Sequence, residues 1–516
     1  MSFPDFRKKP LSGGASGRPV FPAVSALGSV VGLFGLVVGG SCTEVEGAEV
    51  EPLSFVSVDF PIFLAVVFAL YYLSTSILTQ NLVLLIASYV FYGFWDWRFI
   101  PLLFGISAAN YVAAILITQT SSSARKKTYL WVASAISLAA LALFKYFNFF
   151  VSSALSGAAL FGVKMQIPTA KILLPLGISF MTFQGIAYVV DVWRGEHAAE
   201  RNLVRFLAFK AFFPQLVAGP IERASHLLDQ FSRPRTLSLD RLRCAVWLMI
   251  YGYFLKIAIA DNMAAIVDSL FVTTQPFAWS VILGTIAFGI QIYADFCGYS
   301  LIAKGAALLF GFDLIWNFRF PYWATSISDF WRRWHISLSN WLRDYLYIPL
   351  GGSRYGQIVT GRNLLVTMGL GGLWHGASWN FVLWGVLHGV ALTAWRFLPV
   401  PTSPVASIGR AAGWLITMVV VFTGWFLFRA NSWDLMSGMV SAFSNWEWAP
   451  VHASLVTAIA AVMMPLLFLE WLLQRKGDFF LVQSPIWIAY PTYASFVILS
   501  LAMVSHYQAS FIYFQF

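Results

Sequence analysis

The chain has 516 residues, of which 59% are hydrophobic and only 11% are charged. Because soluble globular proteins carry about 25% charged residues, this composition excludes an ordinary soluble domain and predicts an all-α protein that crosses a membrane many times. The net charge of +10 does not require a nucleic-acid partner, since basic cytoplasmic loops of a membrane protein account for it. Cys42, Cys244 and Cys297 form no spaced pair, so the sequence predicts neither a disulfide framework nor a zinc site.

Residues 1–53 form an N-terminal extension ahead of the main membrane domain, residues 54–516. Basic residues at 7–9 precede an apolar run at 23–38, and glutamates between 44 and 51 follow it. This order of charges favours either a retained membrane anchor or a cleaved signal peptide, and both place residue 50 outside the cytoplasm.

Segments of about 20 apolar residues, the length that spans a bilayer, recur along the membrane domain. The predicted spans lie near 55–72, 80–97, 101–118, 128–152, 245–271, 278–296, 377–397, 411–430, 453–473 and 485–507. Shorter or polar-interrupted apolar stretches lie between them, at 172–192, 204–219, 298–316, 324–350 and 361–374. We expect these stretches to be tilted or re-entrant helices that line a cavity, because they are too short or too polar to face lipid. The arginine-rich stretch 222–243 predicts a cytoplasmic loop, which either contacts anionic headgroups or only sets the orientation.

An aromatic and basic stretch near residue 330 carries the first candidate site residues. Ser326 and Asp329 have the spacing of a capping box, which predicts that a helix begins there. On one continuous helix His335 lies on an inward, aromatic face, whereas Arg333 and Asn340 lie on a polar face. We take Arg333 and Asn340 as candidates for binding a substrate or donor. The alternative for the arginine is an interfacial anchor without a ligand.

The run Leu373-Trp-His-Gly-Ala-Ser-Trp-Asn380 carries the second candidate site. A titratable side chain is costly in hydrocarbon, so His375 between two apolar helices indicates a function. The glycines around it permit a close approach of helices. Trp374 and Asn380 are further candidates for binding a substrate or donor. His388 continues a polar and aromatic stripe from Asn380, and its alternative role is a structural hydrogen bond between helices.

Two buried histidines without a metal-ligand pattern favour general base chemistry, since the ordinary pKa of histidine lies near neutrality. Transfer of an acyl group to a hydroxyl needs such a base and a donor that stabilises the oxyanion. A metal site made of His335, His375 and His388 is a competing interpretation, but it lacks carboxylate or cysteine partners at ligand spacing. A proton-coupled transporter and a non-catalytic scaffold also remain open, although no repeated halves are visible.

Several motifs resemble the membrane-bound O-acyltransferase (MBOAT) superfamily, in its bacterial alginate O-acetyltransferase type. They are Pro175-Leu-Gly-Ile-Ser-Phe-Met-Thr-Phe-Gln184, Phe213-Pro-Gln-Leu-Val-Ala-Gly-Pro-Ile-Glu-Arg223, Asp295-Phe-Cys-Gly-Tyr-Ser300, the stretch from Asn317 to Gly352, Leu373-Trp-His-Gly-Ala-Ser-Trp-Asn-Phe381, Phe428-Arg-Ala430 and Phe511-Ile-Tyr-Phe-Gln-Phe516. The resemblance covers residues 54–516 and leaves the N-terminal extension unmatched.

The resemblance implies a ring of about 11 to 13 transmembrane helices, each of the usual spanning length, around short tilted or re-entrant helices that line a tunnel. It implies that His375 is the catalytic base and that His335 is the second active-site histidine. It also implies acetyl-CoA as the cytoplasmic acyl donor, with no bound cofactor or metal.

The expected partners are periplasmic acetyltransferase or accessory proteins, membrane lipid and an exported polysaccharide at the bacterial inner membrane. Alginate is the first choice of polymer. The alternatives are O-acetylation of peptidoglycan or cellulose, and D-alanyl transfer to teichoic acid.

Overall fold

The computed structural model describes residues 54–163, 172–216, 219–272, 274–397, 406–504 and 511–514, all of them within one compact unit, Pro52–Phe516. These residues form helices, turns and irregular segments but no strand, which confirms the predicted all-α class. The N-terminal extension and its apolar run at 23–38 lie outside the described residues.

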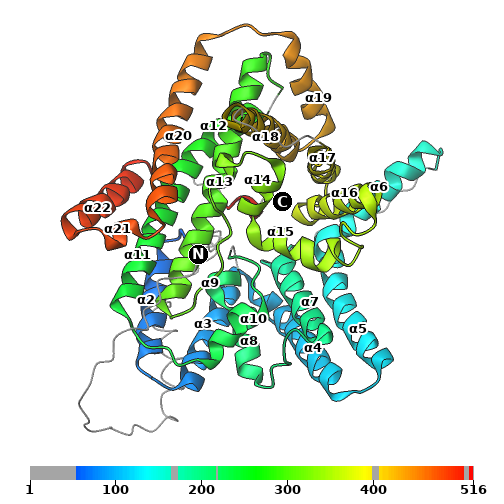
Figure 1. Cartoon of the computed structure of the whole chain (residues 1–516), viewed down its shortest axis with the longest axis vertical. Coiled ribbons are helices and arrows are strands. Elements are labelled where there is room, and N and C mark those ends of the chain that lie inside the picture. The colour runs from blue at the N-terminus through cyan, green and yellow to red at the C-terminus, as the bar shows by residue number, and fades with distance from the viewer. Residues whose placement is uncertain are drawn as a thin grey trace, which may run out of the picture. The chain divides into compact units, whose positions relative to one another are not determined.

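The helices follow one another with mostly short connections (Figure 1). The first part of the chain contains α2 (Asp59–Tyr72), α3 (Ile77–Asp96), α4 (Ile100–Gln119), α5 (Ser123–Leu141), α6 (Phe147–Leu160), α7 (Ile178–Arg194), α8 (Leu203–Ala211), α9 (Phe213–Leu216), α10 (Ala224–Leu227), α11 (Leu239–Tyr253) and α12 (Asp261–Phe271). The second part contains α13 (Ala278–Leu309), α14 (Ile327–Arg333), α15 (Ile336–Leu342), α16 (Gly356–His375), α17 (Trp379–Trp395), α18 (Ala406–Arg429), α19 (Trp433–Ser441), α20 (Pro450–Lys476), α21 (Phe480–Gln483) and α22 (Ile486–Ala502).

Six helical segments of the described residues are long and apolar enough to cross a bilayer: Ile77–Gln119, Ser123–Leu160, Leu239–Phe271, Ala278–Leu309, Gly409–Arg429 and Pro450–Lys476. The shorter apolar helices α2 and α22 accompany them. The protein is therefore a multi-pass membrane protein. The expected total of about 11 to 13 spans stays a prediction, because several of the helices needed to reach it are shorter than the usual spanning length.

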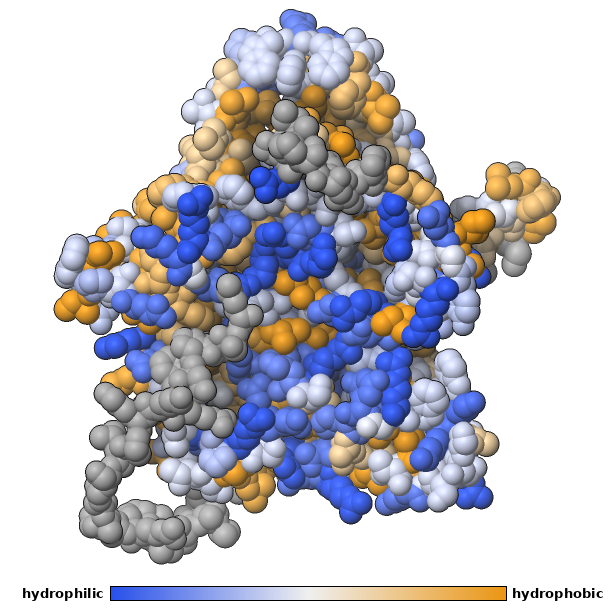
Figure 2. Space-filling view, in the orientation of Figure 1, coloured by the Kyte–Doolittle hydropathy of each residue, from blue (hydrophilic) through white to orange (hydrophobic). Residues whose placement is uncertain are grey.

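Large apolar side chains remain exposed on the outer helices. Phe150 of α6 is 53% exposed, and Trp487 of α22 is 73% exposed. Figure 2 shows hydrophobic residues gathered over the end of α6. Such surfaces are expected where a helix contacts lipid.

Helix α13 is the central element, and it contacts α11, α12, α18 and α20 (Figure 1). The predicted division between a span at 278–296 and a short stretch at 298–316 is wrong, because α13 is one helix of 32 residues. The polar residues that suggested a division are neutralised by other elements. Asp295 pairs with Lys256, and Lys304 pairs with Asp313, so the helix continues through them.

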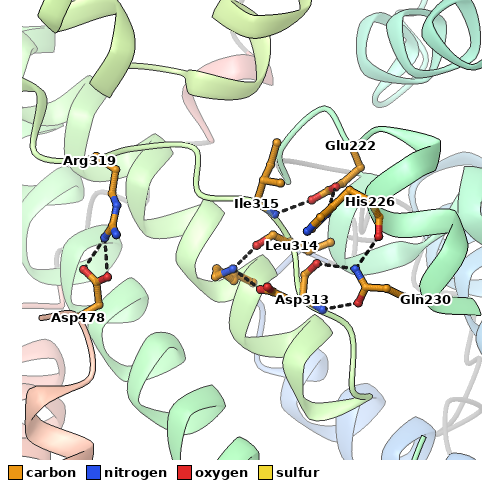
Figure 3. A network of polar contacts seen from close by, with 9 residues as sticks. Glu222, His226, Gln230, Asp313, Leu314, Ile315, Arg319 and Asp478 are labelled. Atoms are coloured by element: carbon orange, nitrogen blue, oxygen red, sulfur yellow. Dashed lines mark hydrogen bonds and ion pairs between the residues drawn. The ribbon is translucent and has the colours of Figure 1, made fainter. Parts of the chain in front are cut away.

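The predicted loop at 222–243 is also wrong in part, because much of it folds against the bundle. Arg235 is only 4% exposed and donates to Asn81 Oδ1 at 2.6 Å, so it does not reach headgroups. In the network of Figure 3, Glu222 accepts from Ile315 N–H at 2.7 Å and lies 2.8 Å from His226 Nδ1. This hydrogen bond to the Glu222 carboxylate raises the pKa of His226.

Candidate active site

His335 lies at a break between α14 and α15. The predicted helix start is confirmed, because the Ser326 hydroxyl accepts from Asp329 N–H, but α14 ends at Arg333 and His335 takes the left-handed conformation with φ +41°. The prediction of one continuous helix from residue 326 onward is therefore wrong. The break is held by the segment around Asn317, whose carbonyl accepts from Ile336 N–H at 2.9 Å.

Among the described residues, one ring nitrogen of the buried His335 has a hydrogen-bond partner and the other has none. Nδ1 lies 3.1 Å from Asn317 Oδ1, which also accepts from the Ser337 hydroxyl at 2.9 Å. Because an amide oxygen can only accept, Nδ1 carries the proton and Nε2 keeps its lone pair. Within the described residues Nε2 has no hydrogen-bond partner. His335 therefore offers a buried acceptor to a ligand.

His375 is the last residue of α16, and a lysine and a tyrosine close this helix end. Lys145 Nζ donates to the carbonyls of Trp374 at 2.9 Å and His375 at 2.8 Å, and Tyr146 donates to the carbonyl of Leu373 at 3.0 Å. Both donors lie in a π-helical turn, Ala142–Tyr146, between α5 and α6. Carbonyls at the end of a helix have no partner within it, so these bonds fix the helix end that carries His375.

Glycines bring α16 and α17 close together, as the sequence predicts. A Cβ on Gly372 would overlap the carbonyl oxygen of Phe381, and a Cβ on Gly385 would overlap that of Met368. The short loop after His375 is equally tight, because a Cβ on Gly376 would overlap the Phe381 ring. Any larger residue at these positions would move α17 away from His375.

The rings of the two histidines lie near each other. Their ring centroids lie 6.2 Å apart, and both rings are nearly inaccessible, at 0% for His335 and 4% for His375. Trp374 lies 5.9 Å from the His335 ring, and Trp384 lies 5.1 Å from the His375 ring. The pair is thus enclosed by aromatic rings, which exclude bulk water from it.

Tyr513 is a site residue that the sequence reasoning does not single out. Its hydroxyl lies 3.2 Å from His375 Nδ1, and the bond fixes the orientation of the imidazole. The terminal motif that contains it supports the family resemblance, but no local pattern predicts that residue 513 reaches residue 375.

The structure places the four candidate binding residues in different surroundings. Arg333 pairs with Asp329 at 2.9 Å, and the half-buried Asn340 makes no hydrogen bond to either histidine in the described part of the chain. Asn380 donates to the carbonyl of Ala430 and so joins α17 to the segment after α18. Trp374 belongs to the wall of the pair. Their binding roles stay predictions.

His388 lies one turn beyond Trp384 on α17. Its fully buried ring stacks on Phe330 at 6.2 Å and 8°, and it meets Trp384 at 4.9 Å. Neither ring nitrogen has a hydrogen-bond partner among the described residues, so the structure contains no interhelical hydrogen bond from it there. The described residues also contain no group of three or more His, Cys, Asp or Glu placed to hold a metal, so the three histidines are not arranged as a metal site.

Fold and site define a multi-pass membrane protein with a buried histidine pair. Residues 196–406, which include both histidines, match the model of MBOAT, the membrane-bound O-acyltransferase family. The chain is 39% identical to the probable alginate O-acetylase AlgI of Pseudomonas putida, over 81% of its own length and 86% of that protein. It is 41% identical to the Pseudomonas aeruginosa protein of the same name, over 79% and 78%. It is 37% identical to the peptidoglycan O-acetyltransferase of Helicobacter pylori, over 70% and 74%. The chain therefore belongs to the membrane-bound O-acyltransferase family and is a membrane O-acyltransferase.

Proposed function

We propose that this protein moves acetyl groups from cytoplasmic acetyl-CoA toward the hydroxyls of an exported polysaccharide at the bacterial inner membrane. The observation that carries the proposal is the buried histidine pair, with ring centroids 6.2 Å apart, in a chain about 40% identical to alginate O-acetylases. Alginate is the favoured polymer because two relatives that the chain matches over most of their length are named alginate O-acetylases.

In this proposal His375 is the general base. In this role Nδ1–H donates to the Tyr513 hydroxyl oxygen, so Nε2 keeps the lone pair that takes the proton of an acceptor hydroxyl. The hydroxyl oxygen attacks the carbonyl carbon of the thioester, a C–O bond forms and the C–S bond breaks. The proton passes from His375 to the departing thiolate, so coenzyme A leaves as a thiol.

His335 acts beside it as a hydrogen-bond acceptor. The tautomer set by Asn317 leaves a lone pair on Nε2, which accepts a hydrogen bond from a second N–H or O–H group of the bound substrate and so orients it beside His375. In this tautomer His335 does not donate to the oxyanion, so that role falls to another group. Candidates are the indole N–H groups of Trp374 and Trp384, which lack partners among the described residues.

The acceptor that meets His375 is either the polymer or a periplasmic partner protein that completes the transfer. We propose the partner route for alginate, since the thioester donor is cytoplasmic and the polymer lies outside. Peptidoglycan is the second candidate polymer, because the chain is 37% identical to a peptidoglycan O-acetyltransferase.

The test compares wild type with His375→Ala and His335→Ala in cells that export alginate. We expect His375→Ala to abolish O-acetylation of the polymer and His335→Ala to lower it more than about tenfold, or about 1.4 kcal/mol of barrier. The control is His452→Gln. His452 is a buried histidine that lies 3.0 Å from the Ser280 hydroxyl and packs against Phe277 and Trp448, which are not part of the histidine pair's surroundings. Folded protein is quantified by size-exclusion chromatography of a fluorescent fusion. Unchanged acetylation in the folded His375→Ala protein refutes the catalytic assignment, and acetylated muropeptides without acetylated alginate shift the substrate to peptidoglycan.

A further inference from the structure

The short segment Phe511–Phe514 near the C-terminus is inserted into the interior of the bundle. Phe511 and Ile512 are each only 1% exposed. The Phe511 ring lies 4.1 Å from the Tyr299 ring, and the Tyr513 ring lies 4.5 Å from the Phe296 ring. Both partners belong to α13, so this helix forms the seat of the segment.

One buried carboxylate bonds the backbone of this segment. Asp295, on α13 beside Phe296, accepts from Ile512 N–H through Oδ2 at 2.7 Å, and it is only 2% exposed. Its other oxygen lies 2.9 Å from Lys256 Nζ. A buried charge is tolerated only when it is paired and hydrogen-bonded, so Lys256 makes a charged acceptor possible at this position.

Neutralising Lys256 does not by itself require Asp295. Lys256 Nζ also lies 2.7 Å from Asp261 Oδ1, so a carboxylate is already present for it. What Asp295 adds is the bond to Ile512 N–H. That bond fixes the chain one residue before Tyr513, and adjacent Cα atoms are only about 3.8 Å apart.

We propose that Asp295 is a positioning residue for acyl transfer: it anchors the segment 511–514 so that the Tyr513 hydroxyl holds the imidazole of His375. This inference rests on the proposed role of His375 as the base. The path has two hydrogen bonds joined by one peptide link. Asp295 accepts from Ile512 N–H at 2.7 Å, Ile512 is followed by Tyr513, and the Tyr513 hydroxyl lies 3.2 Å from His375 Nδ1. A charged acceptor is suited to this task because bonds to charged groups are stronger than neutral ones.

The first test removes the Ile512 N–H, which is the donor of the anchoring hydrogen bond. Ile512→Pro deletes the N–H and leaves the Asp295–Lys256 pair intact, and proline is tolerated at this position because Ile512 is the first residue of a short 3₁₀ helix. The matched control is Ile512→Ala, which keeps the N–H. The second pair is Asp295→Ala against Asp261→Ala, since both remove a carboxylate from Lys256 but only Asp295 bonds Ile512.

Two readouts separate anchoring from general stability. Digestion of the purified protein with carboxypeptidase measures release of the residues from 516 back to 514, which lie beyond the point where proline at 512 would stop the enzyme. Acetyl transfer from radiolabelled acetyl-CoA is measured in the same preparation. We expect Ile512→Pro and Asp295→Ala to speed the release about tenfold or more and to lower kcat by about as much, with KM for acetyl-CoA unchanged. Asp295→Asn keeps an acceptor oxygen, so we expect partial rescue of both.

The inference is overturned if carboxypeptidase releases the C-terminal residues of the Ile512→Pro protein no faster than those of the wild type. It is also overturned if their release is faster but kcat is unchanged. The inference is also overturned if Asp261→Ala has as large an effect as Asp295→Ala, or if Ile512→Ala has as large an effect as Ile512→Pro, because the role is then only structural. If wild-type protein transfers no acetyl group at all, the proposed function fails by itself. The digestion assay then decides whether Asp295 anchors the segment.

Discussion

The hydrogen bond between Asn317 and His335 gives a sharp test of the site. Replacing Asn317 with alanine removes the acceptor that keeps the proton on Nδ1 of His335, at 3.1 Å, and that also accepts from Ser337 at 2.9 Å. A neutral hydrogen bond contributes about 1 kcal/mol net, which corresponds to about a fivefold preference for one tautomer. The two buried side-chain donors, His335 and Ser337, also lose their partner, at about 1–2 kcal/mol each. We therefore expect Asn317→Ala to lower the free energy of unfolding by about 2–4 kcal/mol and the rate of acetyl transfer by about fivefold to tenfold.

The assay is acetyl transfer in membrane vesicles, normalised to folded protein, together with thermal unfolding in detergent. Asn317→Asp is the control, because a carboxylate keeps the acceptor and the tautomer, so we expect it to retain more activity than Asn317→Ala. A folded alanine variant with wild-type activity would refute the tautomer argument. An aspartate variant as slow as the alanine variant would do the same, since the acceptor would then be irrelevant.

Three further predictions concern the surroundings of the pair. Lys145→Met leaves the last carbonyls of α16 without their lysine donor, so we expect thermal destabilisation of about 2 kcal/mol and at least tenfold slower transfer. Lys127→Met, at an exposed position of the preceding helix α5, should change neither. The raised pKa of His226 means that its stabilising bond with Glu222 is fully present below about pH 6.5 and is lost as the pH rises through the raised pKa. The destabilisation by His226→Gln should accordingly be larger at pH 6 than at pH 8 in thermal unfolding, and an equal effect at both would contradict it. Chelator treatment should leave acetyl transfer unchanged, and loss of a stoichiometric metal together with activity, measured by elemental analysis, would restore the metal interpretation.

Local patterns in the sequence were sufficient for several features of the molecule. The lack of charged residues indicated a membrane protein, and Ser326 before Asp329 predicted a real helix start. His375 between apolar helices and His335 in the aromatic stretch were recognised as candidates, and the glycines near His375 predicted the close packing of α16 and α17. Each of these signals acts within a few residues, through hydrophobic burial, capping or steric size.

Only the tertiary structure decided how the site is completed. Lys145 lies 230 residues from His375 and Tyr513 lies 138 residues from it, so no spacing rule connects them. The break at His335 depends on bonds to Asn317, and the continuity of α13 depends on Lys256 pairing with Asp295. In each case a polar group that looks costly in hydrocarbon is satisfied by a partner from a distant segment. Burial makes an unpaired polar group expensive, and which partner satisfies it depends on how the helices pack.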